Sequence, residues 1–272
     1  MQWSRSFLVG ACIVVAVLLA GCATEQPGQA DDPLQPVNRV TFQVNQKADH
    51  YVIRPLAQGY QKVTPQFVRN RVTNFFDNLF YPQTIVNDFL QAKFARGGKD
   101  IGRLLVNSTF GIVGLFDVAK YWGMPKHDED FGQTLGYWGV QPGWYLVLPL
   151  LGPSDVRDGI GMAVDLPLNA LLYVNNSTVS WSLFGLDAVN TRAMLLKADQ
   201  FIQNALDPYL FMRDAYLQHR RSQIYDGNPP PELPGLPGNG NGSSPPTGIP
   251  PAGKANHGGG KQGSAAAAAG AL

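Results

Sequence analysis

Apolar residues recur at gaps of three and four along most of residues 33–225, which is the spacing of helices with an apolar side. The first predicted helix begins near Val37 and is closed by the Arg54-Pro55 pair. A second begins at Thr64-Pro65, where threonine is a good N-cap and proline suits the first helical position. The apolar positions of the two helices are Val37, Val40, Val44, Ala48 and Tyr51, then Val68, Val72, Phe75, Phe76 and Leu79.

Proline and glycine predict where the later helices are interrupted. We expect Tyr81-Pro82 to interrupt the second helix and Arg96-Gly97-Gly98 to be a break further along. The longest helical pattern runs from about Trp181 past Ile202. A final helix begins at Asp207-Pro208 and ends near Tyr225.

The stretch 131–158 is apolar, yet its glycines and prolines are too frequent for one long helix. We predict a helix capped by Asp130 and a turn at Gln141-Pro142-Gly143. Extended or irregular chain follows from Trp144 to Leu148 and is stopped by Pro149. The next helix is capped by Ser154 or Asp155, with Val156, Ile160 and Ala163 facing inward. A segment of this kind needs either a protein core or a lipid to pack against.

The fold class predicted from these patterns is mainly α, because no alternating run is longer than about five residues. The helices carry apolar residues on more than one face, but none reaches the roughly 20 apolar residues that cross a bilayer. Such helices fit a soluble core, which is the commoner case, or a position within one membrane leaflet. Composition alone does not separate the two.

The two ends of the chain differ from this middle part. Residues 1–21 have the basic start and apolar run of a secretory signal, and Leu19-Ala20-Gly21-Cys22 resembles the lipobox of bacterial lipoproteins. Cys22 is therefore the predicted site of acylation, and residues 22–32 form a polar tether. Residues 33–225 form one helical domain, and the Gly-, Pro- and Ala-rich residues 226–272 are predicted to be disordered. These features indicate a membrane-tethered periplasmic protein.

Charge and cysteine content exclude several classes of function. Lysine and arginine total 21 against 20 acidic residues, with no basic run, which argues against a nucleic-acid partner. Cys12 leaves with the signal, so Cys22 is the only thiol of the mature chain. An internal disulfide and the usual structural zinc sites are thereby excluded.

The sequence contains no recognisable catalytic set, and we expect neither an enzyme nor a cofactor or metal site. The four histidines are far apart, and the cluster 127–130 (His-Asp-Glu-Asp) is better explained as a solvated loop that ends in a helix cap than as a metal site. Gly152–Val156 lacks the second glycine of a GxSxG nucleophile elbow. Gly159-Ile160-Gly161 neither extends to a dinucleotide fingerprint nor follows a strand.

Two features point to lipid contact, each with a plainer alternative. Arg96 and Lys99, with the glycines between them, are candidates for contact with a phosphate head group, or the segment is a bare connector between helices. Four tryptophans with their neighbouring tyrosines form either an interfacial belt or ordinary core packing. These tryptophans are Trp122, Trp138, Trp144 and Trp181.

Residues 32–225 resemble, in order and almost throughout, the MlaA (VacJ) family of Gram-negative outer-membrane lipoproteins. The densest part of the match is Phe131–Gly136. The matching residues are Asp32-Pro33-Leu34, Asn38-Arg39, Arg54-Pro55, Asn78-Leu79, Pro82, Val86-Asn87, Phe89-Leu90-Gln91, Arg103, Asn107-Ser108-Thr109, Gly111, Gly114, Asp117, Phe131-Gly132-Gln133-Thr134-Leu135-Gly136, Tyr145, Leu148-Pro149, Gly152, Arg157-Asp158, Thr191-Arg192-Ala193, Asp207-Pro208-Tyr209, Arg213 and Ala215-Tyr216.

The resemblance implies a single disc of short and medium helices lodged in the periplasmic leaflet of the outer membrane. An amphipathic channel through the disc would take phospholipids that have strayed into the outer leaflet. These lipids would pass to the periplasmic carrier MlaC and then to an inner-membrane ABC-type complex, and the family also associates with trimeric porins. Outer-membrane lipid asymmetry would be maintained in this way.

The resemblance also implies a hairpin-like loop beside the channel, within about Gly136–Gly152, whose turn Pro142 and Gly143 would supply. The candidate loop residues are Gly136, Tyr137, Trp138, Pro142, Gly143, Trp144, Pro149 and Gly152. Two other classes stay open: a structural lipoprotein that braces porins without moving lipid, and a lipid hydrolase, which would need a nucleophile and base that the sequence does not display.

Overall fold

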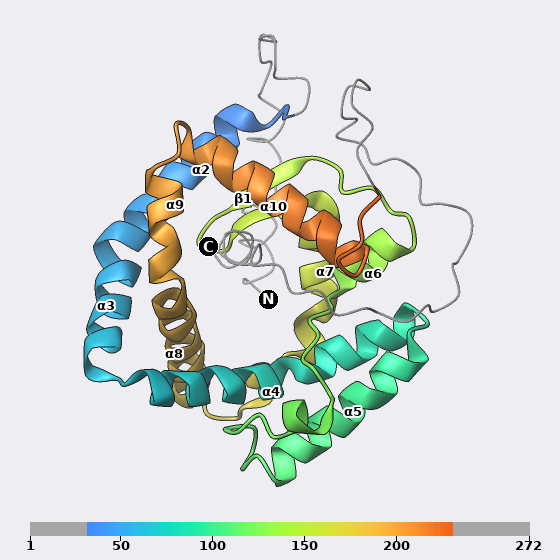
Figure 1. The fold of residues 1–272 in the computed structure, drawn as a ribbon. Helices are drawn as coiled ribbons and strands as arrows, with labels where there is room; N and C mark the ends of the chain where they lie inside the picture. Colours follow the sequence, from blue (N-terminus) through green and yellow to red (C-terminus); the bar gives the residue numbers. More distant parts are fainter. Residues whose placement is uncertain (1–31, 231–272) are drawn as a thin grey trace, which may run out of the picture.

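The computed structural model of the protein describes residues 32–230, and this part of the chain is mainly helical, as predicted (Figure 1). The helices are α2 (Gln35–Ala48), α3 (Arg54–Val63), α4 (Gln66–Leu90), α5 (Phe94–Thr109), α6 (Phe131–Tyr137), α7 (Val156–Asp165), α8 (Ser177–Leu195), α9 (Asp199–Gln203) and α10 (Pro208–Ile224). The strands are β1 (Tyr145–Leu148) and β2 (Gly152–Asp155). The shorter turns are the π-helix η1 (Asp49–Ile53) and the 3₁₀ turns η2 (Ala119–Trp122), η3 (Leu166–Leu168), η4 (Ala170–Tyr173) and η5 (Leu196–Ala198). The predicted signal, Cys22, nearly all of the tether and residues 231–272 lie outside the described residues.

The elements follow one another around a ring. Figure 1 shows α2 and α3 on one side, α4 below, α6 and α7 on the opposite side, and α10 with the hairpin closing the top. Helix α8 packs along α3 on the inner side of the ring, and α5 packs along α4 on the outer side. The ring is closed by contacts of α10 with α6 and of α2 with β1.

Two prolines expected to end helices do not do so. Pro55 lies in the first turn of α3, and the helix does not break before it, because the π-helix η1 joins α2 to α3. Pro82 lies inside α4, which continues to Leu90. Contacts on both sides hold that helix together, because the Tyr81 hydroxyl donates to Asp100 (2.9 Å) and the Asn87 amide donates to Asp165 (3.1 Å).

The break expected at Arg96-Gly97-Gly98 is also wrong, since these residues lie in the first turns of α5. The chain turns earlier, before Phe94, where Ala92 has a left-handed backbone (φ 58°). Gly97 does not interrupt the helix but allows close packing. A Cβ there would lie 3.0 Å from the ring of Phe89, so the glycine lets α5 pack closely against the end of α4.

The hairpin is present, but its turn is not where we expected it. Strand β1 pairs antiparallel with β2, from Tyr145 opposite Asp155 to Leu148 opposite Gly152, so the turn is 149–151. Leu150 in the turn and Gly152, the first residue of β2, have positive φ (63° and 85°). Pro142 and Gly143 precede β1 instead, because backbone bonds from Arg157 and Val156 to the carbonyls of Pro142 and Trp144 bind this segment to the start of α7. The extended chain before Pro149 is confirmed.

Helix ends were easier to predict than helix lengths. The side chains of Asp130 and Asp155 cap α6 and α7 by accepting backbone N–H bonds, as expected, and Asp207 caps α10 in the same way. The predicted cap at Thr64 is wrong, since Pro65 precedes α4 and no side chain caps that helix. The longest described helix is α4, not the Trp181–Ile202 pattern, which divides into α8, η5 and α9. The tighter η5 turn lets Asp199 reach Arg192 (3.0 Å).

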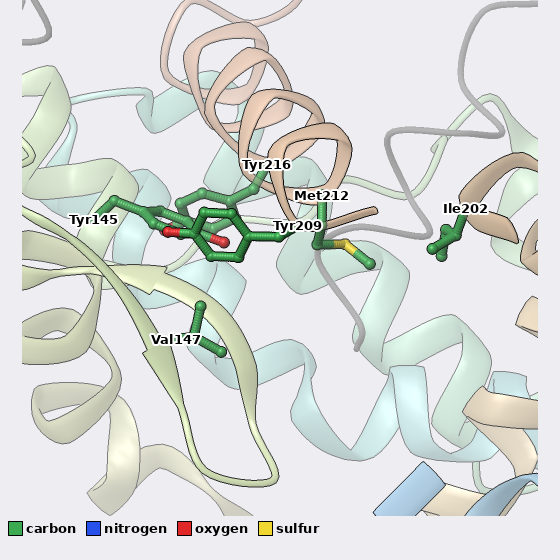
Figure 2. Close-up of a cluster of buried hydrophobic side chains, with 6 residues drawn as sticks. All are labelled: Tyr145, Val147, Ile202, Tyr209, Met212 and Tyr216. Atoms are coloured by element: carbon green, nitrogen blue, oxygen red, sulfur yellow. The ribbon is translucent and has the colours of Figure 1, made fainter. Parts of the chain in front are cut away.

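The apolar core is small. Figure 2 shows Tyr145, Tyr209 and Tyr216 gathered at α10. The ring centroid of Tyr145 lies 6.2 Å from that of Tyr209 and 5.9 Å from that of Tyr216. Val147 and Met212 belong to the same cluster. This cluster attaches the hairpin to α10, which fixes the hairpin at the ring.

Candidate functional site: a polar interior and an amphipathic cavity

The helices expose apolar residues and bury charged ones, the reverse of a soluble protein. In α7, Val156 and Ile160 are exposed (38% and 54%), whereas Arg157, Asp158 and Asp165 are buried. The prediction that Val156, Ile160 and Ala163 face inward is therefore wrong, because it assumed water outside the molecule. All four tryptophans of the predicted belt are at least half exposed, so core packing does not explain them. None of the helices among residues 32–230 has the length and hydropathy needed to cross a membrane.

Buried ion pairs join the helices where apolar side chains would join those of a soluble protein. Arg220 of α10 donates to both carboxylate oxygens of Asp130 (2.6 and 2.9 Å) and pairs with Asp158 of α7, which also accepts from Tyr216. Burial alone would raise the pKa of Asp158, but Arg220 brings it below its ordinary value. The same cationic side chain lowers the pKa of Asp130 against the effect of burial. The buried Asp158 and the half-buried Asp130 are thus both held charged.

Helices α6 and α7 approach so closely that only glycine fits between them. A Cβ on Gly161 would lie 2.3 Å from the backbone nitrogen of Gly132, and one on Gly132 would lie 2.5 Å from Asp158 Oδ1. This contact brings the buried Asp158 next to Asp130 and Arg220. The two glycines therefore position the ion pairs as well as the helices.

Two asparagines of α2, seven residues apart, bind the free edge of β1 as another strand would. Asn38 donates to the Tyr145 carbonyl and accepts from the Val147 N–H, both at 2.9 Å. Asn45 donates to the Leu148 carbonyl (2.8 Å) and accepts from the Leu150 N–H (2.9 Å). Asn38 is buried and Asn45 is only partly so. The hairpin is thus fixed at its base and bound more openly at its tip.

An amphipathic cavity of about 120 Å³ lies among α2, η1, the hairpin, α8 and α10. Its lining residues are Phe42, Asn45, Gln46, Asp49, Ile53, Tyr145, Val147, Leu150, Gly152, Pro153, Ala188, Arg192 and Met212. One part of the wall is aromatic and aliphatic, and the other carries two amides and one ion pair. Such a wall suits a molecule with a polar and an apolar part.

The ion pair of the cavity is rigid. Arg192 donates to both oxygens of Asp49 (2.7 and 2.8 Å) and to Asp199 (3.0 Å), and Asp199 also pairs with Arg54 (3.4 Å). Burial works against the charge of Arg192, but the two carboxylates raise its pKa above the ordinary value. Within residues 32–230 no group of three or more His, Cys, Asp or Glu side chains is placed to hold a metal ion.

Residues 30–223 match the family model of the MlaA lipoprotein. The chain belongs to the MlaA lipoprotein family. Among its relatives, the intermembrane phospholipid transport system lipoprotein MlaA of Escherichia coli (strain K12) is 38% identical over 213 residues, covering 74% of this chain and 82% of the relative. The protein of the same name from Haemophilus influenzae is 30% identical, covering 79% and 89%. A chain from a study of the structural basis for maintenance of bacterial outer membrane lipid asymmetry has a TM-score of 0.62 at 34% identity, covering 72% of this chain and 99% of its own.

The structure separates the residues that were expected to form one loop of the MlaA-like domain. Gly136 and Tyr137 belong to α6, and the indole of Trp138 donates to the Leu90 carbonyl at the end of α4. Pro142, Gly143 and Trp144 precede β1, while Pro149 and Gly152 flank or form the hairpin turn. Of the eight, Gly152 lines the cavity described above.

Arg96 has other partners than the predicted phosphate. Its guanidinium pairs with Asp88 (2.7 Å), Asp226 (2.6 Å) and Glu129, and its backbone N–H, like that of Gly97, bonds to the Lys93 carbonyl. Asp226, which we assigned to the tail, therefore contacts the folded part. Lys99 is exposed on α5. Contact of Arg96 and Lys99 with a head group stays a prediction.

Sequence reasoning gave no role to the cavity residues Asn45, Asp49 and Arg192. Arg192 belongs to the residues that carry the family resemblance, but polarity alone set Asn45 and Asp49 apart, and polar residues on a helix ordinarily face water. Their position is decided by the hairpin and α8, which come from distant parts of the chain.

Proposed function

We propose that this protein is an outer-membrane lipoprotein that removes mislocalised phospholipids from the outer leaflet and passes them to a periplasmic carrier. Lipid asymmetry of the outer membrane is thereby maintained. The observation that carries the proposal is the combination of an apolar exterior with an amphipathic cavity inside a ring of helices. The names of its relatives in intermembrane phospholipid transport support the same function.

The polarity of the ring suggests how it lies in the membrane. Exposed side chains such as Trp181, Phe110 and Leu105 favour acyl chains and the interface over water. None of the described helices combines the length and hydropathy of a membrane span, and we place the ring within one leaflet. The buried ion pairs stay paired there, so they avoid the cost of isolated charge in an apolar medium.

Passage of lipid through this ring requires no covalent step, so we propose a transporter and not an enzyme. The polar wall shields the head group while the acyl chains remain against apolar surface. The further partners that we propose, on family resemblance, are the periplasmic carrier MlaC and a trimeric porin. Attachment to the periplasmic face of the outer membrane through acylated Cys22 belongs to the same proposal.

The hairpin tip is the part of this site that we propose as a gate. Leu150 lies at the tip, is 67% exposed and also lines the cavity, so movement of the tip changes the shape of the cavity. In the double variant Asn45→Cys/Leu150→Cys, a disulfide would replace the side-chain bonds and hold the tip on α2.

We expect the oxidised form of this variant to raise outer-leaflet phospholipid to the level of a strain lacking the protein. The same variant kept reduced is the matched control for the two substitutions. Equal phospholipid levels in both states, with the disulfide shown to be complete, would exclude the hairpin as a gate.

A further inference from the structure

The charged part of the cavity wall consists of one acid and one base. Among the residues that line the cavity, only Asp49 and Arg192 carry a charge, and the two cancel. The guanidinium group of Arg192 is already bound by two acids, since Asp49 accepts two of its hydrogen bonds and Asp199 accepts a third. Asp199 is itself shared with Arg54. The wall therefore has no cation left to neutralise an added negative charge.

A ligand with net negative charge would enter this cavity near two carboxylates. Their charge is matched by guanidinium groups that already face them, so an extra anion finds no cation to pair with and leaves the cavity with an uncompensated charge. A head group with both charges avoids this, because its ammonium group offsets the charge of its own phosphate.

Amide groups at the same wall suit such a head group. Gln46 lies on the cavity side of α2, half-buried, and its amide can both donate to a phosphate oxygen and accept from an ammonium group. The neighbouring Asn45 amide is already bound to the hairpin. A compact zwitterionic head group therefore suits the polar part of the wall.

We infer that this cavity selects phospholipids whose head group carries no net charge, such as phosphatidylethanolamine, over anionic ones such as phosphatidylglycerol. The inference rests on the proposed function and names the lipid class that the same site takes. Asp49 is the specificity-determining residue, because its carboxylate neutralises Arg192, which would otherwise attract an anionic head group.

The test is a competition on the wild-type, full-length, acylated protein. Purified protein in detergent is incubated with micelles holding equal amounts of phosphatidylethanolamine and phosphatidylglycerol, re-isolated, and its bound lipid is identified by mass spectrometry. We expect roughly tenfold more phosphatidylethanolamine, since about 1.4 kcal/mol for one uncompensated charge corresponds to a factor of ten in binding. Equal binding or an excess of phosphatidylglycerol overturns the inference. Absence of any bound phospholipid overturns the proposed function itself, and the inference with it.

A pair of matched variants assigns the selectivity to Asp49. Asp49→Asn should bring the lipid ratio several-fold closer to one. Asp207→Asn also removes an aspartate paired with an arginine (Arg39, 2.7 Å), but outside the cavity and at a helix cap that asparagine also forms. Asp207→Asn should keep the wild-type ratio of bound lipids. An unchanged ratio in Asp49→Asn, with a normal thermal unfolding midpoint, contradicts the role of Asp49. If Asp49→Asn does not fold, the competition on the wild-type protein still decides the inference.

Discussion

Single residues hold this ring together by two means: glycines that let helices touch, and asparagines that bind the hairpin. Gly132 and Gly161 face each other at the α6–α7 contact. The sequence indicates neither, since a glycine within an apolar stretch reads first as a break. The role of Asn38 and Asn45 is hard to recognise in the sequence for another reason. A polar residue on an amphipathic helix is ordinarily a solvent-facing one, and its strand partner is more than 100 residues away.

The glycine contact predicts that Gly161→Ala is strongly destabilising. Its new Cβ would overlap the backbone of Gly132 at 2.3 Å, and backbone cannot rotate away. We expect a loss of at least about 2 kcal/mol in the free energy of unfolding, at the upper part of the range for overpacking. The control is Gly159→Ala on the same helix, where nothing lies within 4 Å and alanine favours the helix. Similar thermal unfolding midpoints for the two variants would show that the helices do not touch there.

The asparagine contacts predict a gradient of stability along the hairpin. Asn38→Ala leaves the Tyr145 carbonyl and the Val147 N–H buried without their partner, which costs about 2–3 kcal/mol. Asn45→Ala should cost less, because water can replace its bonds at the exposed tip. Hydrogen–deuterium exchange measures both: Asn38→Ala should speed exchange through the whole hairpin and Asn45→Ala at its tip alone. Equal effects of the two substitutions would refute the gradient.

At the scale of elements, some helix starts were predictable and continuity was not. A cap is a local contact, so Asp130 and Asp155 could be assigned from the sequence. Whether a helix continues through Pro82 depends on partners such as Asp100 and Asp165, which lie on other elements. The hairpin turn was misplaced for a similar reason, because Pro142 and Gly143 carry the residue types of a turn.

Asp155 at the start of α7 makes the stability of the fold depend on pH. Burial, and then the nearby Asp158, raise the pKa of Asp155 to about 7 from an ordinary 3.8. The folded state thus binds this proton more tightly than the unfolded chain, so the stabilisation from Asp155 is complete below about pH 4 and is lost as the pH rises towards 7. Asp158 and Asp130 have the opposite effect on stability. Their pKa values are lowered in the folded state, so the stability that they contribute is lost only as the pH falls into the acid range.

Asp155→Asn should therefore remove a fall in stability between about pH 4 and pH 7, of up to about 1.4 kcal/mol per pH unit. Asparagine keeps the helix cap, so the comparison isolates the proton. The measurement is the free energy of unfolding of both proteins at several pH values. Parallel curves for variant and wild type would mean that Asp155 does not titrate in this range.

For the whole molecule, the sequence indicated a helical domain but not which side of its helices faces inward. Helices with apolar residues on several faces fit a soluble core, the commoner case, or a leaflet. The structure favours the second, because residues such as Arg157, Asp158 and Arg220 are buried while Val156, Trp144 and Trp181 are exposed. Family membership then joins this inverted polarity to lipid transport.

The most direct test of this account measures phospholipid in the outer leaflet of a strain that lacks the protein. We predict an increase over the parent strain, reversed by the wild-type gene and not by Cys22→Ser, which removes the proposed site of acylation. An outer leaflet with unchanged phospholipid content in the deletion strain would contradict the account.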